Sequence, residues 1–233
     1  MLLPIRDENS KRIFPLTTLI LLAANIGIFV YQMIQGEQGQ AFIYRFGTIP
    51  WEIVNFRELP DLKWDFQSPV PNLITLVTSM FLHGGLLHLI GNMLYLWIFA
   101  DNVEALMGHG RFVFFYLLCG IAATLTHVAF SPDSTLPMVG ASGAISGVLG
   151  AYFIRFPRAK VHMLFYFVII LRVFKVPASV MLGVWFAMQL FSGMSSQGQT
   201  GGGVAWFAHI GGFVAGIVLV LFFEKRRRVL RLS

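Results

Sequence analysis

The sequence has little charge. Of its 233 residues, 12% are Asp, Glu, Lys or Arg and 56% are hydrophobic. A soluble globular domain carries about 25% charged residues, so half of the usual solubilising charge is missing. Apolar stretches of about 18 to 20 residues recur instead, and each is long enough for a helix to cross a hydrocarbon core about 30 Å thick. The composition excludes an ordinary soluble domain and predicts a multi-pass membrane protein.

Cysteine is also scarce. The single cysteine, Cys119, excludes an internal disulfide and fits no metal site, and its apolar surroundings predict that it faces lipid or fills the core. No metal or cofactor is expected. The net charge of +6 could suggest nucleic acid. The basic residues lie at helix ends and in a tail, however, where membrane topology and anionic lipid account for them. We therefore expect membrane lipids, and no nucleic acid, as partners.

The apolar runs predict an all-α polytopic membrane protein with a bundle of six transmembrane helices. The expected spans are 13–34, 86–103, 111–130, 141–156, 177–191 and 204–223. They divide the chain into a cytoplasmic N-terminal segment (1–12), a six-helix domain (13–223) and a basic cytoplasmic tail (224–233). The first run is too long for a signal peptide and lacks a small-x-small cleavage site. The fourth span is short, so its start is expected to lie below the outer surface.

Three connections between the spans have distinct compositions. Residues 35–71 contain four prolines, which are expected to interrupt any helix, and many aromatic residues, which favour the headgroup region. The apolar run from His162 to Leu171 is too short to cross as a helix, so we expect an interfacial segment on the inner face. The stretch from Ser192 to Gly203 is rich in Gly, Ser and Gln, which predicts a flexible connection that could act as a mobile cap over one end of the bundle.

The distribution of basic residues predicts the orientation. If residues 1–12 are cytoplasmic, only three of the 17 Lys and Arg residues, namely Arg45, Arg57 and Lys63, lie on the outer side. The positive-inside rule then favours both termini in the cytoplasm, and we expect the bacterial cytoplasmic membrane. This orientation places the starts of the second, fourth and sixth spans toward the outer face.

Four polar residues fall within the outer third of these three spans. His88 and Asn92 lie at i and i+4 on one face of the second, Ser142 opens the fourth, and His209 lies near the start of the sixth. Polar groups in hydrocarbon are costly unless they find partners, so such a cluster indicates a functional site.

The residue types in this cluster suit acyl transfer. A serine hydroxyl becomes a good nucleophile when a base accepts its proton, and histidine has the pKa for that task. We expect Ser142 and His209 to form this pair, with Asn92 and His88 as donors to the oxyanion of the tetrahedral intermediate. The carboxylates Asp101 and Glu104 lie at the opposite end of their helix. The sequence therefore predicts a dyad in which packing orients the imidazole.

Each residue also has a simpler interpretation. A serine on a glycine-rich stripe often bonds its own helix, and a membrane histidine often only links helices. His83 is expected at the membrane interface. Three histidines could in principle bind zinc, but no acidic residue accompanies them, and the rings of His83 and His88 would point about 140° apart on a helix.

Three sequence motifs together resemble those of the rhomboid intramembrane serine proteases. They are His83 to Asn92 with Asp101 to Glu104, Gly140-Ala141-Ser142-Gly143, and Ala208-His209-Ile210-Gly211-Gly212. The resemblance implies a six-helix protease domain that cuts single-pass transmembrane substrates in or near the bilayer without metal or cofactor. It further implies that Ser142 is the nucleophile, His209 the general base, and His88 and Asn92 the oxyanion donors.

The chain departs from this family pattern at two places. Some members have an aromatic residue four positions after the nucleophile, where this chain has Ser146. Many members have a Trp-Arg pair in the first outer loop, where this chain has Trp51-Glu52 and Trp64-Asp65. The first departure leaves open what holds the ring of His209, and the second indicates different loop contacts.

Two other functions compete with proteolysis. A non-catalytic relative would bind transmembrane helices and escort them, but every expected catalytic position is filled. A transporter would need intramembrane carboxylates for ion coupling or an internal repeat, and the sequence shows neither.

Overall fold

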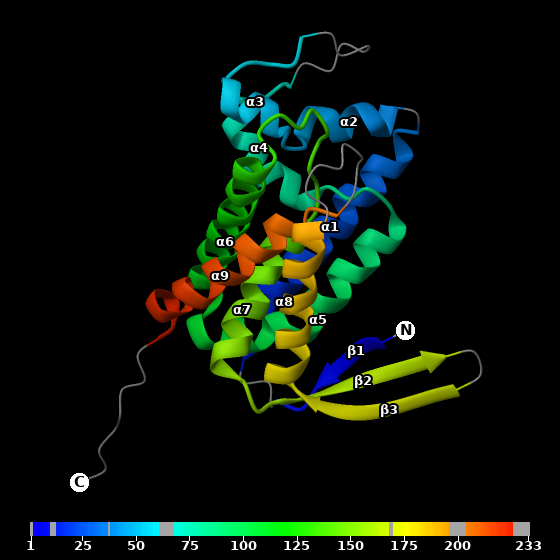
Figure 1. The fold of residues 1–233 in the computed structure, drawn as a ribbon, viewed down its shortest axis with the longest axis vertical. Coiled ribbons are helices and arrows are strands. Elements are labelled where there is room, and N and C mark those ends of the chain that lie inside the picture. The colour runs from blue at the N-terminus through cyan, green and yellow to red at the C-terminus, as the bar shows by residue number, and fades with distance from the viewer. Residues whose placement is uncertain are drawn as a thin grey trace.

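The computed structural model describes residues 2–9, 13–36, 38–60, 68–167, 170–195 and 204–225. Figure 1 shows a helical bundle with a small sheet at one end. The helices are α1 (Leu16–Ile34), α2 (Gln38–Phe46), α3 (Pro50–Asn55), α4 (Asn72–Thr78), α5 (Leu86–Met107), α6 (His109–Phe130), α7 (Ser142–Arg155), α8 (Ala178–Ser195) and α9 (Trp206–Phe223). A 3-10 turn, η1 (Ser79–Phe81), follows α4, and the strands are β1 (Leu2–Asp7), β2 (Lys160–Phe167) and β3 (Ile170–Pro177).

The predicted bundle of membrane helices is confirmed. Among the described residues, α1, α5, α6, α8 and α9 are each long and apolar enough to cross a membrane. The sixth helix of the bundle, α7, has 14 residues and is therefore about 21 Å long at the usual helical rise. In the part of the chain that the structure describes, the small sheet is the departure from an all-α architecture.

Helix α7 lies in the interior of the bundle. Every residue from Gly143 to Tyr152 is buried, so this helix has no face for lipid along most of its length. Its glycines allow α9 to approach closely, because a Cβ at Gly150 or Gly212 would collide with backbone atoms of the facing helix. Cys119 of α6 is fully buried against this crossing, so it fills the core and does not face lipid.

The prolines of 35–71 do not prevent helices, contrary to the sequence prediction. Helix α2 fits between Glu37 and Pro50, and Pro50 itself begins α3, a position where its missing N–H costs nothing. Phe56 then ends α3 in the left-handed conformation with φ of 52°. Residues 61–67, including Trp64-Asp65, lie outside the described residues.

The sequence analysis missed the sheet. The run after Lys160 forms an antiparallel hairpin, β2–β3, and β1 pairs with β2 in the order β1-β2-β3. Leu3 pairs with Leu164, so the first strand meets its partner far along the chain. Residues 1–12 were expected to be a plain polar segment, but residues 2–7 belong to this sheet.

Polar contacts attach β1 to the helices. The Asp7 carboxylate accepts hydrogen bonds from Tyr152 of α7 at 2.5 Å and from the Asn102 amide of α5 at 2.9 Å. The next residue, Glu8, contacts His162 at 2.9 Å and Lys175 at 2.5 Å from the other side of the sheet. These two hydrogen bonds lower the pKa of the Glu8 carboxyl, with that from Lys175 having the larger effect.

Candidate active site

Ser142 is the first residue of α7, and the backbone before it is unusual. Gly140 has φ of 127°, a conformation that side-chain-bearing residues rarely adopt. A Cβ there would also come within 2.7 Å of the His88 ring. The Gly140 N–H donates to the carbonyl of Ser79 at 2.9 Å, which fixes the turn. A glycine is therefore needed to bring the start of α7 beside His88.

His209 of α9 meets Ser142 directly. Its Nε2 lies 2.8 Å from the Ser142 Oγ. The distance is short because α7 and α9 cross at glycines, with Gly212 against the carbonyl of Gly143. The structure thus brings together a hydroxyl and an imidazole from separate spans at hydrogen-bonding distance.

Gln189 of α8 holds the other side of the imidazole. Its Oε1 lies 2.7 Å from His209 Nδ1, and its Nε2 donates to the carbonyl of Trp185 at 3.4 Å. An amide oxygen can only accept, so the proton sits on Nδ1 and Nε2 is free to accept from the serine. The rings of Trp185 and Trp206 pack near the imidazole, with centroids 6.0 and 6.3 Å away.

The sequence analysis missed Gln189. It expected packing alone to orient His209, and Ser146 left the packing partner open. A buried amide in the middle of an otherwise apolar span was the available signal, because such a group needs a partner. The two tryptophans supply the packing, and the glutamine supplies a hydrogen bond in addition.

His88 and Asn92 of α5 line the same cavity as Ser142 and His209. Asn92 is buried, and its side-chain Nδ2 has no hydrogen-bond acceptor among the described residues. His88 Nδ1 accepts weakly from the Gly84 N–H at 3.4 Å. Both side chains can therefore offer a donor to a group placed in the cavity.

His83 and Ser146 have structural surroundings. His83 is fully buried, which differs from the interfacial position that we expected. Its ring packs on His88 with centroids 5.2 Å apart, and its carbonyl accepts from Gln32 at 2.8 Å. Burial, with a smaller effect from His88, lowers the pKa of His83 to about 4. Ser146 Oγ donates to the carbonyl of Ser142 at 2.6 Å, so its hydroxyl proton is already used.

The cavity has a volume of about 1480 Å³. Besides the four polar residues, the connection from Ser131 to Val139 lines it. That connection is held in place by an antiparallel bridge between Thr48 and Met138. The expected cap at 192–203 lies outside the described residues beyond Ser195. Within the described part of the chain, no group of three or more His, Cys, Asp or Glu side chains could hold a metal ion.

A sequence model of the Rhomboid domain matches residues 71–226. This range includes the four polar residues of the cavity, His88, Asn92, Ser142 and His209. The chain belongs to the rhomboid family. It is 36% identical over 154 residues to the putative rhomboid protease YdcA of Bacillus subtilis, a match that covers 64% of this chain and 67% of that protein. It is also 32% identical over 162 residues to the mitochondrial Rhomboid protein 1 of Saccharomyces cerevisiae, which covers 67% of this chain and 43% of that protein.

A shorter match of higher identity joins this rhomboid chain to the rhomboid protease GluP of Bacillus subtilis. The two are 46% identical over 76 residues, which is 33% of this chain and 14% of that protein. The chain thus spans less than half of the length of some relatives that it matches. Membership of a family with named proteases supports intramembrane proteolysis as the general activity.

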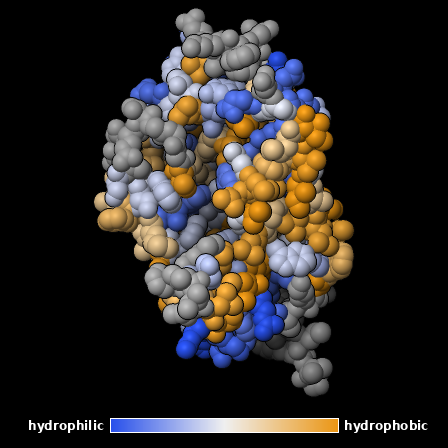
Figure 2. All heavy atoms as spheres, turned by 90° about the vertical axis from the view of Figure 1, so that its right-hand side faces the viewer, coloured by the Kyte–Doolittle hydropathy of each residue, from blue (hydrophilic) through white to orange (hydrophobic). Residues whose placement is uncertain are grey.

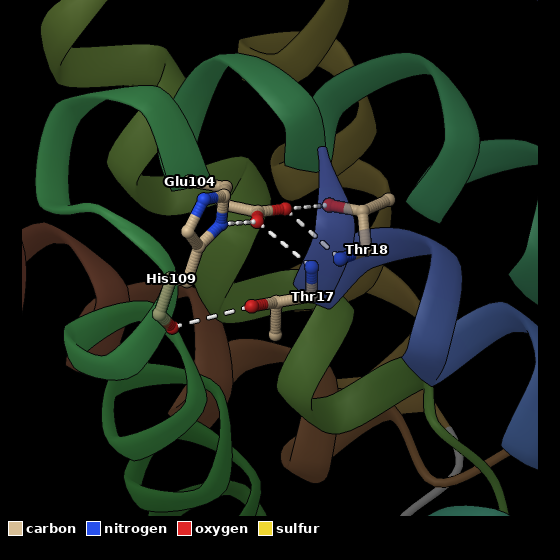
Figure 3. Close-up of polar contacts among 4 residues, drawn as sticks. All are labelled: Thr17, Thr18, Glu104 and His109. Atoms are coloured by element: carbon tan, nitrogen blue, oxygen red, sulfur yellow. Dashed lines mark hydrogen bonds and ion pairs between the residues drawn. The ribbon is translucent and has the colours of Figure 1, made fainter. Parts of the chain in front are cut away.

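In this rhomboid chain the carboxylate of Glu104 lies far from Ser142. It is near the end of α5, whereas His88 and Asn92 are near its start. Figure 3 shows it at the start of α1, where it accepts from the backbone N–H groups of Thr17 at 2.8 Å and Thr18 at 2.9 Å. The Thr18 hydroxyl donates to it at 2.6 Å, and His109 Nδ1 lies 2.6 Å away. Glu104 therefore caps the first helix and has a structural role.

Proposed function

We propose that this chain is an intramembrane serine endopeptidase with a Ser142–His209 dyad. The observation that carries the proposal is the 2.8 Å approach of the His209 Nε2 to the Ser142 Oγ across two spans. Family membership supports it, because two relatives, GluP and YdcA of Bacillus subtilis, are named as a rhomboid protease and a putative rhomboid protease.

In the proposed reaction, Ser142 Oγ attacks the carbonyl carbon of the scissile peptide while its proton passes to His209 Nε2. The C–N bond then breaks, and His209 gives the proton to the leaving amine. Water attacks the resulting acyl-enzyme with His209 again accepting a proton. The bond between the acyl carbon and Ser142 Oγ then breaks, and His209 returns its proton to Oγ. The acid product leaves, and the serine hydroxyl is restored.

The tetrahedral intermediates carry an oxyanion that needs fixed donors. We assign this task to the Asn92 amide, the His88 ring and the backbone N–H of Ser142. The buried Asn92 Nδ2 suits it, because this donor has no acceptor among the described groups and can donate to the oxyanion without giving up another hydrogen bond.

The substrates would be single-pass transmembrane proteins, since the cavity lies among spanning helices. The polar lining of the cavity gives water a place beside the serine, which hydrolysis requires. The residues in these roles need neither metal nor cofactor.

A fluorophosphonate probe tests the proposal, because it reacts covalently with an activated serine. We expect labelling of the wild-type protein in detergent or vesicles and its loss in Ser142→Ala and His209→Ala. Ser146→Ala is the matched control, since it removes a neighbouring hydroxyl four residues on, and it should still label. A wild-type protein that is folded yet unlabelled would favour the non-catalytic relative that binds transmembrane helices.

A further inference from the structure

The β2–β3 hairpin has hydrophobic residues on both faces beyond the bundle. In an antiparallel pair, directly opposed residues share a face, so Met163 and Phe174 lie on one face while Leu164 and Val173 lie on the other. Leu171, Val173 and Phe174 are 64%, 51% and 42% exposed. Isolated exposed apolar side chains are ordinary, but a projecting hairpin with both faces apolar is not.

The base of the sheet shows which face meets the helices. Val161 and Met163 belong to the hydrophobic core, and Asp7, opposite Val161, bonds to helices α5 and α7. The other face carries the polar pair of Glu8 and Lys175. The base is thus satisfied by the bundle on one side and by ion pairs on the other. On the outer half, the side chains of Leu171 and Val173 stay exposed on the face that points away from the bundle.

The direction of the hairpin relates it to the bilayer. Figure 1 shows β2 and β3 running outward from the bundle at a steep angle to the long helices. The arrowhead of β2 lies higher than its base, toward the level of the spans. A hairpin running in this direction would extend along the plane of a membrane that surrounds the spans.

The charges around the hairpin complement an anionic surface. Arg172 lies on the apolar outer half of the hairpin. Lys160 and Lys175 lie at its base, and Arg158 comes just before β2. Figure 2 faces the side from which the hairpin projects and shows strongly hydrophilic surface below a hydrophobic area at the lower end. Lys and Arg side chains place apolar stems in lipid and their charge among headgroups.

We propose that the outer half of the β2–β3 hairpin inserts into the adjacent lipid leaflet and binds anionic phospholipid headgroups through Arg172. Lipid is the occupant because the surface is continuous with the lipid-facing spans and is bordered by basic residues. Both faces being apolar fits immersion, whereas a hairpin lying flat on the membrane would expose one of them to water.

Site-directed fluorescence tests this insertion. Because Cys119 is buried, a cysteine introduced at Leu171 or Val173 is the reactive thiol for an NBD label. The protein is reconstituted into vesicles of phosphatidylcholine, with or without phosphatidylglycerol, in which part of the phosphatidylcholine carries brominated acyl chains. Arg6→Cys, on the polar base of the same sheet, is the matched control.

We expect the labels at 171 and 173 to emit as in an apolar medium and to lose most of their emission to the brominated lipid. The label at position 6 should emit as in water. Phosphatidylglycerol should strengthen the quenching, and Arg172→Gln should remove that gain. Water-like, unquenched emission at 171 and 173 would overturn the proposal. So would energy transfer between labelled copies that persists on dilution with lipid, because a second copy would then cover the hairpin.

Discussion

The imidazole of His209 is held between two neighbours, a serine on one nitrogen and an amide on the other. In serine hydrolases a carboxylate usually occupies the second position, where it fixes the tautomer and stabilises the imidazolium. Gln189 can fix the tautomer as a carboxylate would. It carries no charge, however, so it can stabilise an imidazolium only through the dipole of its amide. Its place on α8 also makes the orientation of the imidazole depend on the position of a third helix.

Gln189→Leu is therefore expected to lower kcat about fivefold with little change in KM, because it removes a hydrogen bond worth about 1 kcal/mol that orients the imidazole. Gln189→Glu should restore orientation and move the acidic limb of the pH–rate profile to higher pH, since a carboxylate favours the protonated imidazole. Cleavage of a single-pass substrate across a range of pH measures both effects.

Gln32→Glu is the matched control for this experiment, because Gln32 is another buried glutamine and bonds to the backbone of His83. Its pH profile should match that of the wild-type protein. If both glutamate variants shift the profile equally, Gln189 has no special relation to His209.

Residue-level reasoning found the serine, the two histidines and the asparagine because each was a polar group at a similar depth in an apolar helix. The structure gathers them around one cavity. Residue-level reasoning could not find the contact of Gln189 with His209, because that contact depends on how α8 is rotated about its axis. Nor could it place His83, whose burial depends on α1 packing over the segment before α5.

At the scale of the elements, the crossing of α7 and α9 determines the site. A Cβ on Gly216 would overlap backbone atoms of Gly147, so Gly216→Ala should separate the two helices. We expect a loss of about 1–3 kcal/mol of stability, as for other overpacked sites, and a matching loss of activity. Thermal unfolding in detergent micelles measures the first effect.

Gly27→Ala in α1 is the control for that substitution. A Cβ at this position meets no atom within 4 Å, and alanine is the better helix former by about 1 kcal/mol. The melting temperature should stay the same or rise. Equal melting temperatures for the two variants would contradict the close crossing.

The cap of α1 leads to a second prediction about elements. Glu104→Gln replaces an acceptor with a donor facing the Thr18 N–H, so we expect a stability loss of about 1.5–3 kcal/mol. Thr18→Val removes only the hydroxyl bond and should cost about 1 kcal/mol. Thermal unfolding measures both, and fluorophosphonate labelling of the folded fraction should be unchanged because the serine lies at the other end of the bundle.

Glu58→Gln, at an exposed glutamate, is the control and should leave the melting temperature unchanged. A Glu104 variant as stable as this control would show that the cap contributes nothing.

The helices could be located from sequence because membrane spans require long apolar runs, and their ends fell within a few residues of the structure. The sheet could not be located from the sequence. From Leu164 to Phe167 its second strand is apolar on both faces, so only Lys160 to Met163 show the alternation that identifies a half-buried strand. Its first strand pairs with residues some 160 positions away, and no local pattern reports such a contact.

For the whole molecule, the distribution of basic residues predicts the sidedness. We expect residue 225 and the sheet on the cytoplasmic side and the connection at 131–139 on the outer side. A reporter pair checks this: green fluorescent protein fused after Lys225 should fluoresce and alkaline phosphatase there should be inactive. The same pair inserted after Asp133 should give the reverse result, and any other combination contradicts the orientation.

Relatives from yeast mitochondria and from Bacillus subtilis both match this chain. The bacterial cytoplasmic membrane therefore remains a prediction from the sequence, as does the division into residues 1–12, 13–223 and 224–233. Residues 226–233 of the basic tail lie outside the described residues.

The pairing of β1 with β2 has a consequence for biosynthesis. Ribosomes add about 5–20 residues each second, so the first strand waits roughly 10–30 s before its partner has been translated. When β2 is translated, α1, α5, α6 and α7 have already been translated, whereas α8 and α9 have not. The two strands can therefore pair before His209 has been added to the chain. The contact between Ser142 and His209 can form only later, once α9 has been made.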